Sequence, residues 1–173
     1  MAKSCPSNKG EELRKQIFGL LNKKKASADT ALKALTQCQS HIRNRIMIEG
    51  VGKESGVTLS GFHTGEHLEL YYDLKHGRHD VGCIAKGWDD PGFRIGDIVK
   101  VAKWKIADMK EHVYVLLQFC ATRGVIVTID EKDTFIEIHL DSVIYQEGMN
   151  KRVFEQVFHY LQECVEKAHE LIP

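Results

Sequence analysis

The stretch that decides the fold is Val125-Ile126-Val127-Thr128-Ile129-Asp130-Glu131-Lys132-Asp133-Thr134-Phe135-Ile136-Glu137-Ile138-His139-Leu140. It holds two apolar, β-branched runs, 125–129 and 135–140, with a polar turn at 131–134 between them. In each run every second residue is apolar, which is typical of a strand with one packed face and one solvated face. We therefore expect an antiparallel hairpin. The residues expected on its packed face are Val125, Val127, Ile129, Ile136, Ile138 and Leu140.

Upstream of this hairpin, apolar residues spaced three and four apart run from Ile95 to Cys120. The segment 96–101 also fits the start of a strand, but the helical spacing continues for twenty-five residues and favours a helix. We expect a long central helix from Asp97 to Arg123, with Asp97 as its N-cap and Gly124 just beyond its end.

Downstream of the hairpin, a final amphipathic helix is expected from about Asn150. Its apolar residues cover an arc of about 160°, which is wider than the ~100° that one docking contact needs. Part of this arc is expected to pack within the chain and part against a second subunit, so the sequence favours a homodimer. The residues expected to carry self-association are Phe154, Phe158 and Leu161.

The middle of the chain, residues 57–86, alternates apolar and polar residues in three short runs. Short links between the runs favour a three-stranded antiparallel meander. Together with the hairpin this gives an α+β fold: an antiparallel sheet of about five strands, packed by the central helix and the C-terminal helix.

The first fifty residues are predicted to be helical and basic. We expect a disordered tail over 1–10, a helix from Glu11 to Lys24, and a second helix that Ser27 or Asp29 caps and that ends before Gly50 and Gly52. One long bent helix is the alternative, because the break at 26–27 is weak. The predicted organisation is a tail at 1–10, a basic helical arm at 11–50 and an α+β domain at 51–173.

Composition places the chain among ordinary globular proteins. It has 173 residues, of which 43% are hydrophobic and 28% charged. No apolar run approaches the ~20 residues of a membrane-spanning helix, and the N-terminus lacks the apolar stretch of a secretory signal. A cytoplasmic location is expected. The five cysteines are widely spaced and form no CxxC pair, which indicates free thiols in a reducing compartment.

Charge is divided unevenly along the chain. Residues 1–48 hold ten Lys or Arg and three Asp or Glu, a net charge of +7, and the other residues carry −7. Such a basic segment fits the binding of nucleic acid or another anionic surface, and it fits equally an arm that folds against its own acidic body. The residues that would contact phosphates are Lys23, Lys24, Lys25, Lys33, Arg43 and Arg45.

Patterns typical of catalysis are weak. The sequence has no GxSxG elbow and no phosphate-binding glycine loop, so no catalytic residue and no cofactor is predicted. A metal-dependent enzyme remains a second alternative, with His63, His67, His76 and His79 as ligands. Against it, residues four apart on one strand lie about 13 Å from each other.

The order of elements in the second half resembles a known group. The matching segments are Leu116–Cys120, Gly124, Val125–Ile129, Asp130–Asp133, Phe135–Leu140 and Phe154–Leu171. Over residues 113–172 they resemble type III secretion chaperones and the YbjN-type regulators, in which a helix, a strand, an acidic turn, a strand and a long amphipathic helix follow one another. By architecture the resemblance extends over residues 28–172. It implies a non-enzymatic protein with hydrophobic contact surfaces.

The function expected from the sequence is therefore a protein-binding module, chaperone-like or regulatory, that offers apolar helix and strand surface to a protein or peptide partner. Exposed aromatic residues beside charged ones are common contact anchors. The anchors predicted here are Tyr71, Trp88 and Trp104.

Overall fold

The computed structural model describes residues 7–24, 27–65, 69–76, 79–87, 90–103 and 110–172 of the chain. The chain divides into two compact units, Met1–Ser40 and His41–Pro173. This boundary lies inside a helix, whereas the sequence predicted a division after residue 50.

The first unit contains helix α1 (Ser7–Lys23) and the beginning of helix α2 (Ala28–Glu54). Ser27 caps α2 as predicted, because its Oγ accepts the Thr30 backbone N–H at 3.2 Å. Residues 7–10, which the sequence assigns to the tail, belong to α1.

The second unit contains the end of α2, which does not stop before Gly50 and Gly52 as predicted but continues to Glu54. Packing explains the difference. Val51 and Gly52 are buried, and a Cβ added at Gly52 would lie 3.0 Å from Leu59 Cδ1. Gly52 therefore does not end the helix. Its missing side chain allows α2 to pack closely against β1.

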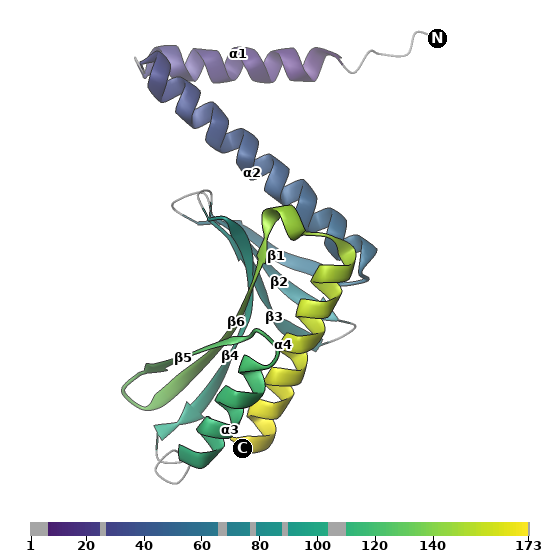
Figure 1. Cartoon of the computed structure of the whole chain (residues 1–173). Helices are drawn as coiled ribbons and strands as arrows, with labels where there is room; N and C mark the ends of the chain where they lie inside the picture. Colours follow the sequence, from purple (N-terminus) through teal and green to yellow (C-terminus); the bar gives the residue numbers. More distant parts are fainter. Residues whose placement is uncertain are drawn as a thin grey trace. The chain divides into compact units, whose positions relative to one another are not determined.

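A six-stranded antiparallel sheet is the centre of the second unit (Figure 1). Its strands are β1 (Thr58–Thr64), β2 (Leu70–His76), β3 (His79–Lys86), β4 (Gly92–Ala102), β5 (Ile126–Glu131) and β6 (Phe135–Tyr145), in the spatial order β1-β2-β3-β4-β6-β5. The predicted α+β class, the meander β1–β3 and the hairpin β5–β6 are confirmed. Val127 lies opposite Leu140 and Ile129 opposite Ile138, so the residues predicted for the packed face share one face. Ile138 and Leu140 are buried there, but Ile129 is 48% exposed, so the prediction that it is packed is wrong.

The sixth strand, β4, is where the sequence prediction is wrong. Residues 97–102 form a strand and not the start of a helix, and helix α3 covers only Lys110–Ala121. The reason is a partner strand far away in sequence, because β4 pairs with β6 along its whole length, from Gly92 opposite Tyr145 to Ala102 opposite Phe135. Asp97 is therefore no helix cap, whereas Gly124 follows the helix with φ 68°, as expected.

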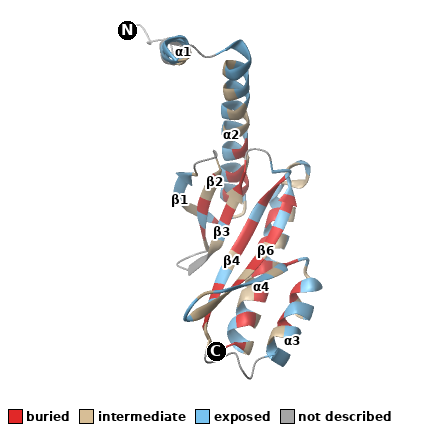
Figure 2. Cartoon of the chain, turned by 90° about the vertical axis from the view of Figure 1, so that its left-hand side faces the viewer, coloured by how far each residue is buried: buried red, intermediate tan, exposed pale blue. Residues whose placement is uncertain are grey.

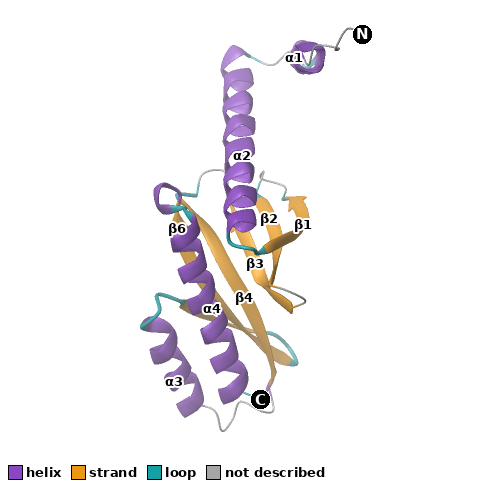
Figure 3. Ribbon diagram, turned by 90° about the vertical axis from the view of Figure 1, so that its right-hand side faces the viewer, coloured by secondary structure: helices purple, strands orange, loops and turns teal. Residues whose placement is uncertain are grey.

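The helices of the second unit lie on one face of the sheet (Figure 1 and Figure 3). Helix α4 (Lys151–Leu171) packs against β4 and β6, and α3 lies beside α4. Asn150 caps α4, since its Oδ1 accepts the Val153 N–H at 3.1 Å. A short 3₁₀ helix, η2 (Gln146–Gly148), joins β6 to α4. The largest core side chains on strands and helices include Phe93, Ile95, Leu140, Phe154 and Leu161.

Candidate functional site

The face of the sheet opposite α4 carries no helix among the residues that the structure describes (Figure 2). We call it the open face. Along the central strands its residues alternate with buried ones: in β4, Arg94, Ile98 and Lys100 alternate with buried Ile95, Val99 and Val101. The register sets its members side by side, with Ile98 opposite His139 and Lys100 opposite Glu137. On β2 to β6 the described side chains of the open face are Tyr71, Asp73, Lys75, Cys83, Ala85, Arg94, Ile98, Lys100, Ala102, Ile126, Thr128, Asp130, Phe135, Glu137, His139, Asp141, Val143 and Tyr145, and on β1 Thr58, Ser60 and His63 lie beside them.

A hollow of about 460 Å³ lies where β2, β3 and β4 meet on this face. Two glycines make room for it. Gly82 has φ 112°, and a Cβ on it would overlap the Gly96 carbonyl. A Cβ on Gly96 would in turn overlap the Asp141 carboxylate. Backbone therefore forms part of the floor. The residues lining the hollow are Asp73, Lys75, Gly82, Cys83, Gly96, Asp97 and Ile98.

Two of the carboxyl groups near the hollow, those of Asp97 and Asp141, are partly buried, whereas Asp73 is exposed. Burial raises the pKa of Asp97 and of Asp141 above the ordinary value of an aspartate. Burial also raises the pKa of the Cys83 thiol, and Asp141, Asp97 and Asp73 raise it further. A protonated thiol is a poor nucleophile, so this arrangement suits hydrogen bonding and contact better than covalent chemistry.

The face that contains the hollow also carries exposed apolar side chains, of which Ile98 lines the hollow itself. Ile98 on β4, Ile126 on β5, and Val143 and Tyr145 on β6 are all exposed, and Tyr145 keeps 63% of its surface accessible. Phe135 and Tyr71 are half-buried on this face. A mixture of exposed apolar and aromatic side chains with charged ones is typical of surfaces that bind a protein partner.

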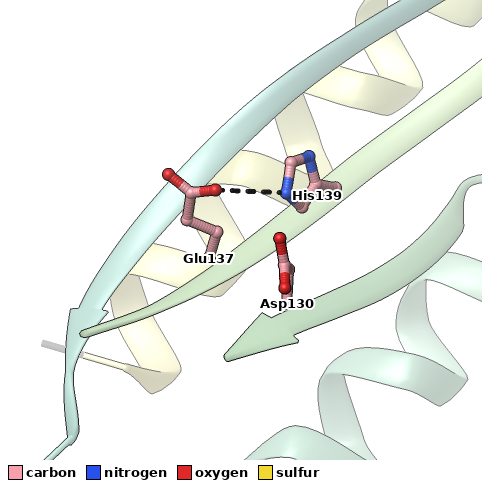
Figure 4. A group of neighbouring side chains, drawn as sticks. All are labelled: Asp130, Glu137 and His139. Atoms are coloured by element: carbon pink, nitrogen blue, oxygen red, sulfur yellow. Dashed lines mark ion pairs between the residues drawn. The ribbon is translucent and has the colours of Figure 1, made fainter. Parts of the chain in front are cut away.

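A cluster of possible metal ligands lies further along β5 and β6 (Figure 4). Ligand atoms of Asp130, Glu137 and His139 lie within 4.8 Å of one another. Two lysines already compensate the charge: Lys132 pairs with Asp130 and lies 3.8 Å from Glu137, and Lys100 Nζ lies 3.2 Å from Glu137. The group fits a surface ion-pair network, because a cation would have to displace these ammonium groups.

The sequence alone does not predict this cluster, because alternation only places Glu137 and His139 on the solvated side of the hairpin. Only the register, which sets Asp130 opposite Glu137, brings the three together.

The predicted partner-binding residues are in different environments. Tyr71 lies on the open face, and its ring stacks on His63 with centroids 4.8 Å apart. Trp88 and Trp104 lie outside the described residues. The prediction that Phe154, Phe158 and Leu161 form a self-association surface is wrong, because all three are buried within the second unit. They fill the core between α4 and the sheet.

The predicted histidine site is described only in part. His63 is exposed, and its Nδ1 lies 3.0 Å from the Gly61 carbonyl oxygen. The backbones of His76 and His79 pair directly across β2 and β3, but their side chains and the whole of His67 lie outside the described part of the chain.

The predicted phosphate contacts fall in both units. Lys23, Lys24 and Lys33 are exposed in the first unit, and Lys25 lies outside the described residues. Arg43 and Arg45 are exposed in the second unit. The Arg45 guanidinium already has two interactions within the second unit. Its Nε donates to Glu49 Oε1 at 2.8 Å, and the group lies 4.4 Å from the centre of the Phe62 ring.

No helix among the described residues is long and apolar enough to cross a membrane. A scan against protein-family models and a search of curated proteins gave no match. Among solved structures, an uncharacterized protein from Methanothermobacter thermautotrophicus is similar, with a TM-score of 0.55 and 16% sequence identity. The match covers 73% of this chain and 97% of that one. At this identity the likeness concerns the fold.

Proposed function

We propose that this protein is a non-enzymatic protein-binding module, chaperone-like or regulatory, whose open face holds a peptide segment of its partner. The observation that carries the proposal is the open face itself. It joins exposed apolar side chains, Ile98, Val143 and Tyr145, to a hollow with a backbone floor. Recognition of an extended or helical segment needs such apolar contacts together with a few polar groups that fix its orientation.

The chemistry of the hollow suggests what it accepts. Its carboxyl groups and exposed backbone are hydrogen-bond acceptors, which suit the N–H groups of a peptide or a basic side chain. Ile98 lines the same hollow and gives apolar contact to the neighbouring side chain of the peptide.

The resemblance to secretion chaperones and YbjN-type regulators is part of the same proposal. From α2 to α4 the structure has the order helix, strands, helix, two strands, helix, with four strands in the first set where the resemblance implies three. The expected cytoplasmic location belongs to the proposal as well.

A library of random twelve-residue peptides displayed on phage tests the proposal. Peptides selected on the wild-type protein are expected to bind Ile98→Asp and Tyr145→Ser variants at least ~10-fold more weakly. Tyr114→Ser is the matched control, because Tyr114 on α3 is 61% exposed, close to the 63% of Tyr145, and lies away from the open face. Equal losses with Tyr114→Ser and Tyr145→Ser, or no selected peptide, would contradict the proposal.

We also propose that the protein forms a homodimer. The contact surface is on α2 and not on the buried side of α4. In the second unit, Ile42 and Ile46 of α2 are 56% and 65% exposed. Helical spacing puts them on the side of α2 opposite buried Ile48 and Val51. Sedimentation equilibrium is expected to show a dimer that Ile46→Lys weakens. A monomer at all concentrations would contradict this part.

Nucleic-acid or anionic-surface binding is the second candidate, favoured by exposed Lys23, Lys24 and Lys33 in the first unit. A titration against duplex DNA or RNA at two salt concentrations decides it. Phosphate contacts predict an affinity that falls steeply as salt rises. Absent or salt-insensitive binding would remove this candidate.

A further inference from the structure

Strands β3 and β4 pair over a much shorter length than either strand has. β4 has 11 residues, but β3 pairs only with Arg94, Ile95 and Gly96. The beginning of β3 remains paired with β2 instead. The two strands part directly before Cys83, at Gly82, whose φ of 112° interrupts the regular course of β3. β4 therefore continues beyond the β2–β3 hairpin (Figure 1 and Figure 3).

Two hydrogen bonds at the ends of β4 show which of its backbone groups point toward β3. Gln146 N–H donates to the Pro91 carbonyl oxygen at 3.1 Å, and Lys103 N–H donates to the Thr134 carbonyl oxygen at 3.2 Å. Both bonds continue the register between β4 and β6. Because backbone groups alternate in direction along a strand, the odd-numbered residues of β4 bond to β6 and the even-numbered ones point away from it. Beyond Gly96 these are Ile98, Lys100 and Ala102.

We call the edge formed by these three residues the β4 edge. No strand of the described part of the chain pairs with it. The Ile98 N–H donates to the Asp97 side chain, Oδ1, at 2.7 Å, so a carboxylate lies where a strand would otherwise accept this bond. Ile98 is 45% exposed and Lys100 is exposed as well. The Lys100 side chain lies along the open face, with its Nζ 3.2 Å from Glu137, and so leaves the edge accessible.

We propose that the peptide segment of the partner binds as an additional β-strand along the β4 edge. This inference rests on the proposed function and specifies its binding mode. Backbone donors and acceptors at every second residue match the backbone of an extended chain and not that of a helix, whose own groups are paired internally. At about 3.3 Å per residue, positions 98–102 accommodate a strand of roughly five residues.

The hollow lies at the inner end of the β4 edge, because Gly96 and Ile98 line it. Its lining includes two carboxylates, Asp73 and Asp97, and one ammonium group, Lys75, which together give a net charge of −1. The peptide side chain that enters the hollow should therefore be basic. From Gly96 onward β3 already occupies the edge, so a longer peptide has to leave the plane of the sheet there and continue over the open face.

Amide hydrogen exchange, measured by nuclear magnetic resonance on the full chain, tests the inference. The probe is a peptide selected from the twelve-residue library. Without peptide, the amides of Lys100 and Ala102 should exchange quickly, whereas those of Val99 and Val101, which face β6, should exchange slowly. Saturating peptide should slow the exchange of Lys100 and Ala102 at least ~10-fold and leave Val99 and Val101 unchanged.

A proline substitution tests the same contact by affinity. Lys100→Pro removes an N–H of the β4 edge and none of the bonds to β6, and proline is tolerated at such edge positions. Lys100→Ala is the matched control, since it loses the same side chain and keeps the N–H. The peptide should bind Lys100→Pro at least ~10-fold more weakly than Lys100→Ala. If Lys100→Pro does not fold, copies of the peptide that are N-methylated at single positions are tested on the wild-type protein. Binding should then be lost at every second position of the paired segment.

The outcomes separate this inference from the proposed function. A peptide that binds without protecting Lys100 and Ala102, or that binds both Lys100 variants equally, would overturn the inference and leave the open face as the binding surface. Slow exchange of these two amides without peptide would also overturn it, because the edge would already be paired. If no peptide is selected, the proposed function fails and the inference fails with it.

Discussion

The two faces of the sheet are built from the same strands and differ in almost every property. In β4, Phe93, Ile95 and Val99 point into the core, whereas Arg94 and Ile98, their sequence neighbours, are exposed. The face on which α4 packs, which we call the covered face, contributes the buried core that stabilises the second unit. The open face contributes little to the core. Stability and binding can therefore be changed separately, by substituting alternate residues of one strand.

The largest effect should come from the covered face. Phe154 is buried and stacks on Phe158, with ring centroids 6.0 Å apart. Phe154→Ala should lower the free energy of unfolding by about 3–5 kcal/mol, because it leaves a cavity under α4. Urea denaturation measures this. Tyr145→Ser on the open face should cost less than ~0.5 kcal/mol, and similar losses for both would erase the distinction between the faces.

The second-largest loss of stability should come from substituting Gly96, a glycine on the open face. A Cβ on Gly96 would overlap the Asp141 carboxylate and approach the Leu140 carbonyl oxygen to 3.0 Å. Gly96→Ala should therefore cost about 1–3 kcal/mol in urea denaturation and narrow the hollow. Gly148→Ala is the control, since a Cβ there meets nothing within 4 Å. Equal losses in the free energy of unfolding for the two substitutions would show that Gly96 is not closely packed against Asp141 and Leu140.

A hydrogen bond between α2 and β2 should give a smaller effect. The Tyr72 hydroxyl donates to Glu49 Oε1 at 2.8 Å, and burial with this bond raises the pKa of Tyr72 to about 12. Tyr72→Phe should cost about 1 kcal/mol at neutral pH.

The pH dependence of that cost has a definite sign. Hydrogen bonds from Arg45 and then Tyr72 lower the pKa of Glu49 below its usual value. The stability from a depressed carboxyl pKa is present above the unfolded pKa and is lost as pH falls through the folded one. The cost of Tyr72→Phe should shrink on acidification to pH about 3. A cost that is constant with pH would show that Glu49 does not accept this bond in solution.

The smallest effect should have the opposite sign. Since burial raises the pKa of Asp141, the folded state disfavours its charged form at neutral pH, and this penalty disappears as pH falls through the folded pKa. Asp141→Asn should raise the free energy of unfolding by less than ~1 kcal/mol and therefore raise the melting temperature slightly. The same substitution should weaken peptide binding. A lower melting temperature would mean that the Asp141 charge stabilises the fold.

The parts of the fold that depend on local pattern could be predicted from the sequence. The hairpin β5–β6, the start of α4 at Asn150 and the turn at Gly124 each have their signal within a few residues. The strand β4 was not predicted, because Ile95, Ile98 and Ala102 follow the three-and-four spacing of a helix face. Only its pairing with β6, forty residues away, makes this segment a strand.

The candidate site was predictable only in outline. A contact surface on sheet and helix was expected, but Phe154, Phe158 and Leu161 were assigned to the wrong surface because an apolar arc does not tell which partner covers it. Of the predicted anchors, Tyr71 lies on the open face. The hollow depends on Gly82 and Gly96, which approach each other across two strands, and no local pattern shows such an approach.

The most direct test of the open face as the binding surface is nuclear magnetic resonance of protein labelled at the isoleucine δ-methyl groups. A peptide selected from the twelve-residue library is titrated into it. We expect the signals of Ile98 and Ile126 on the open face to shift with peptide, while those of Ile95 and Ile138 on the covered face stay in place. Shifts at Ile42 and Ile46 of α2 with none at Ile98 and Ile126 would contradict the account.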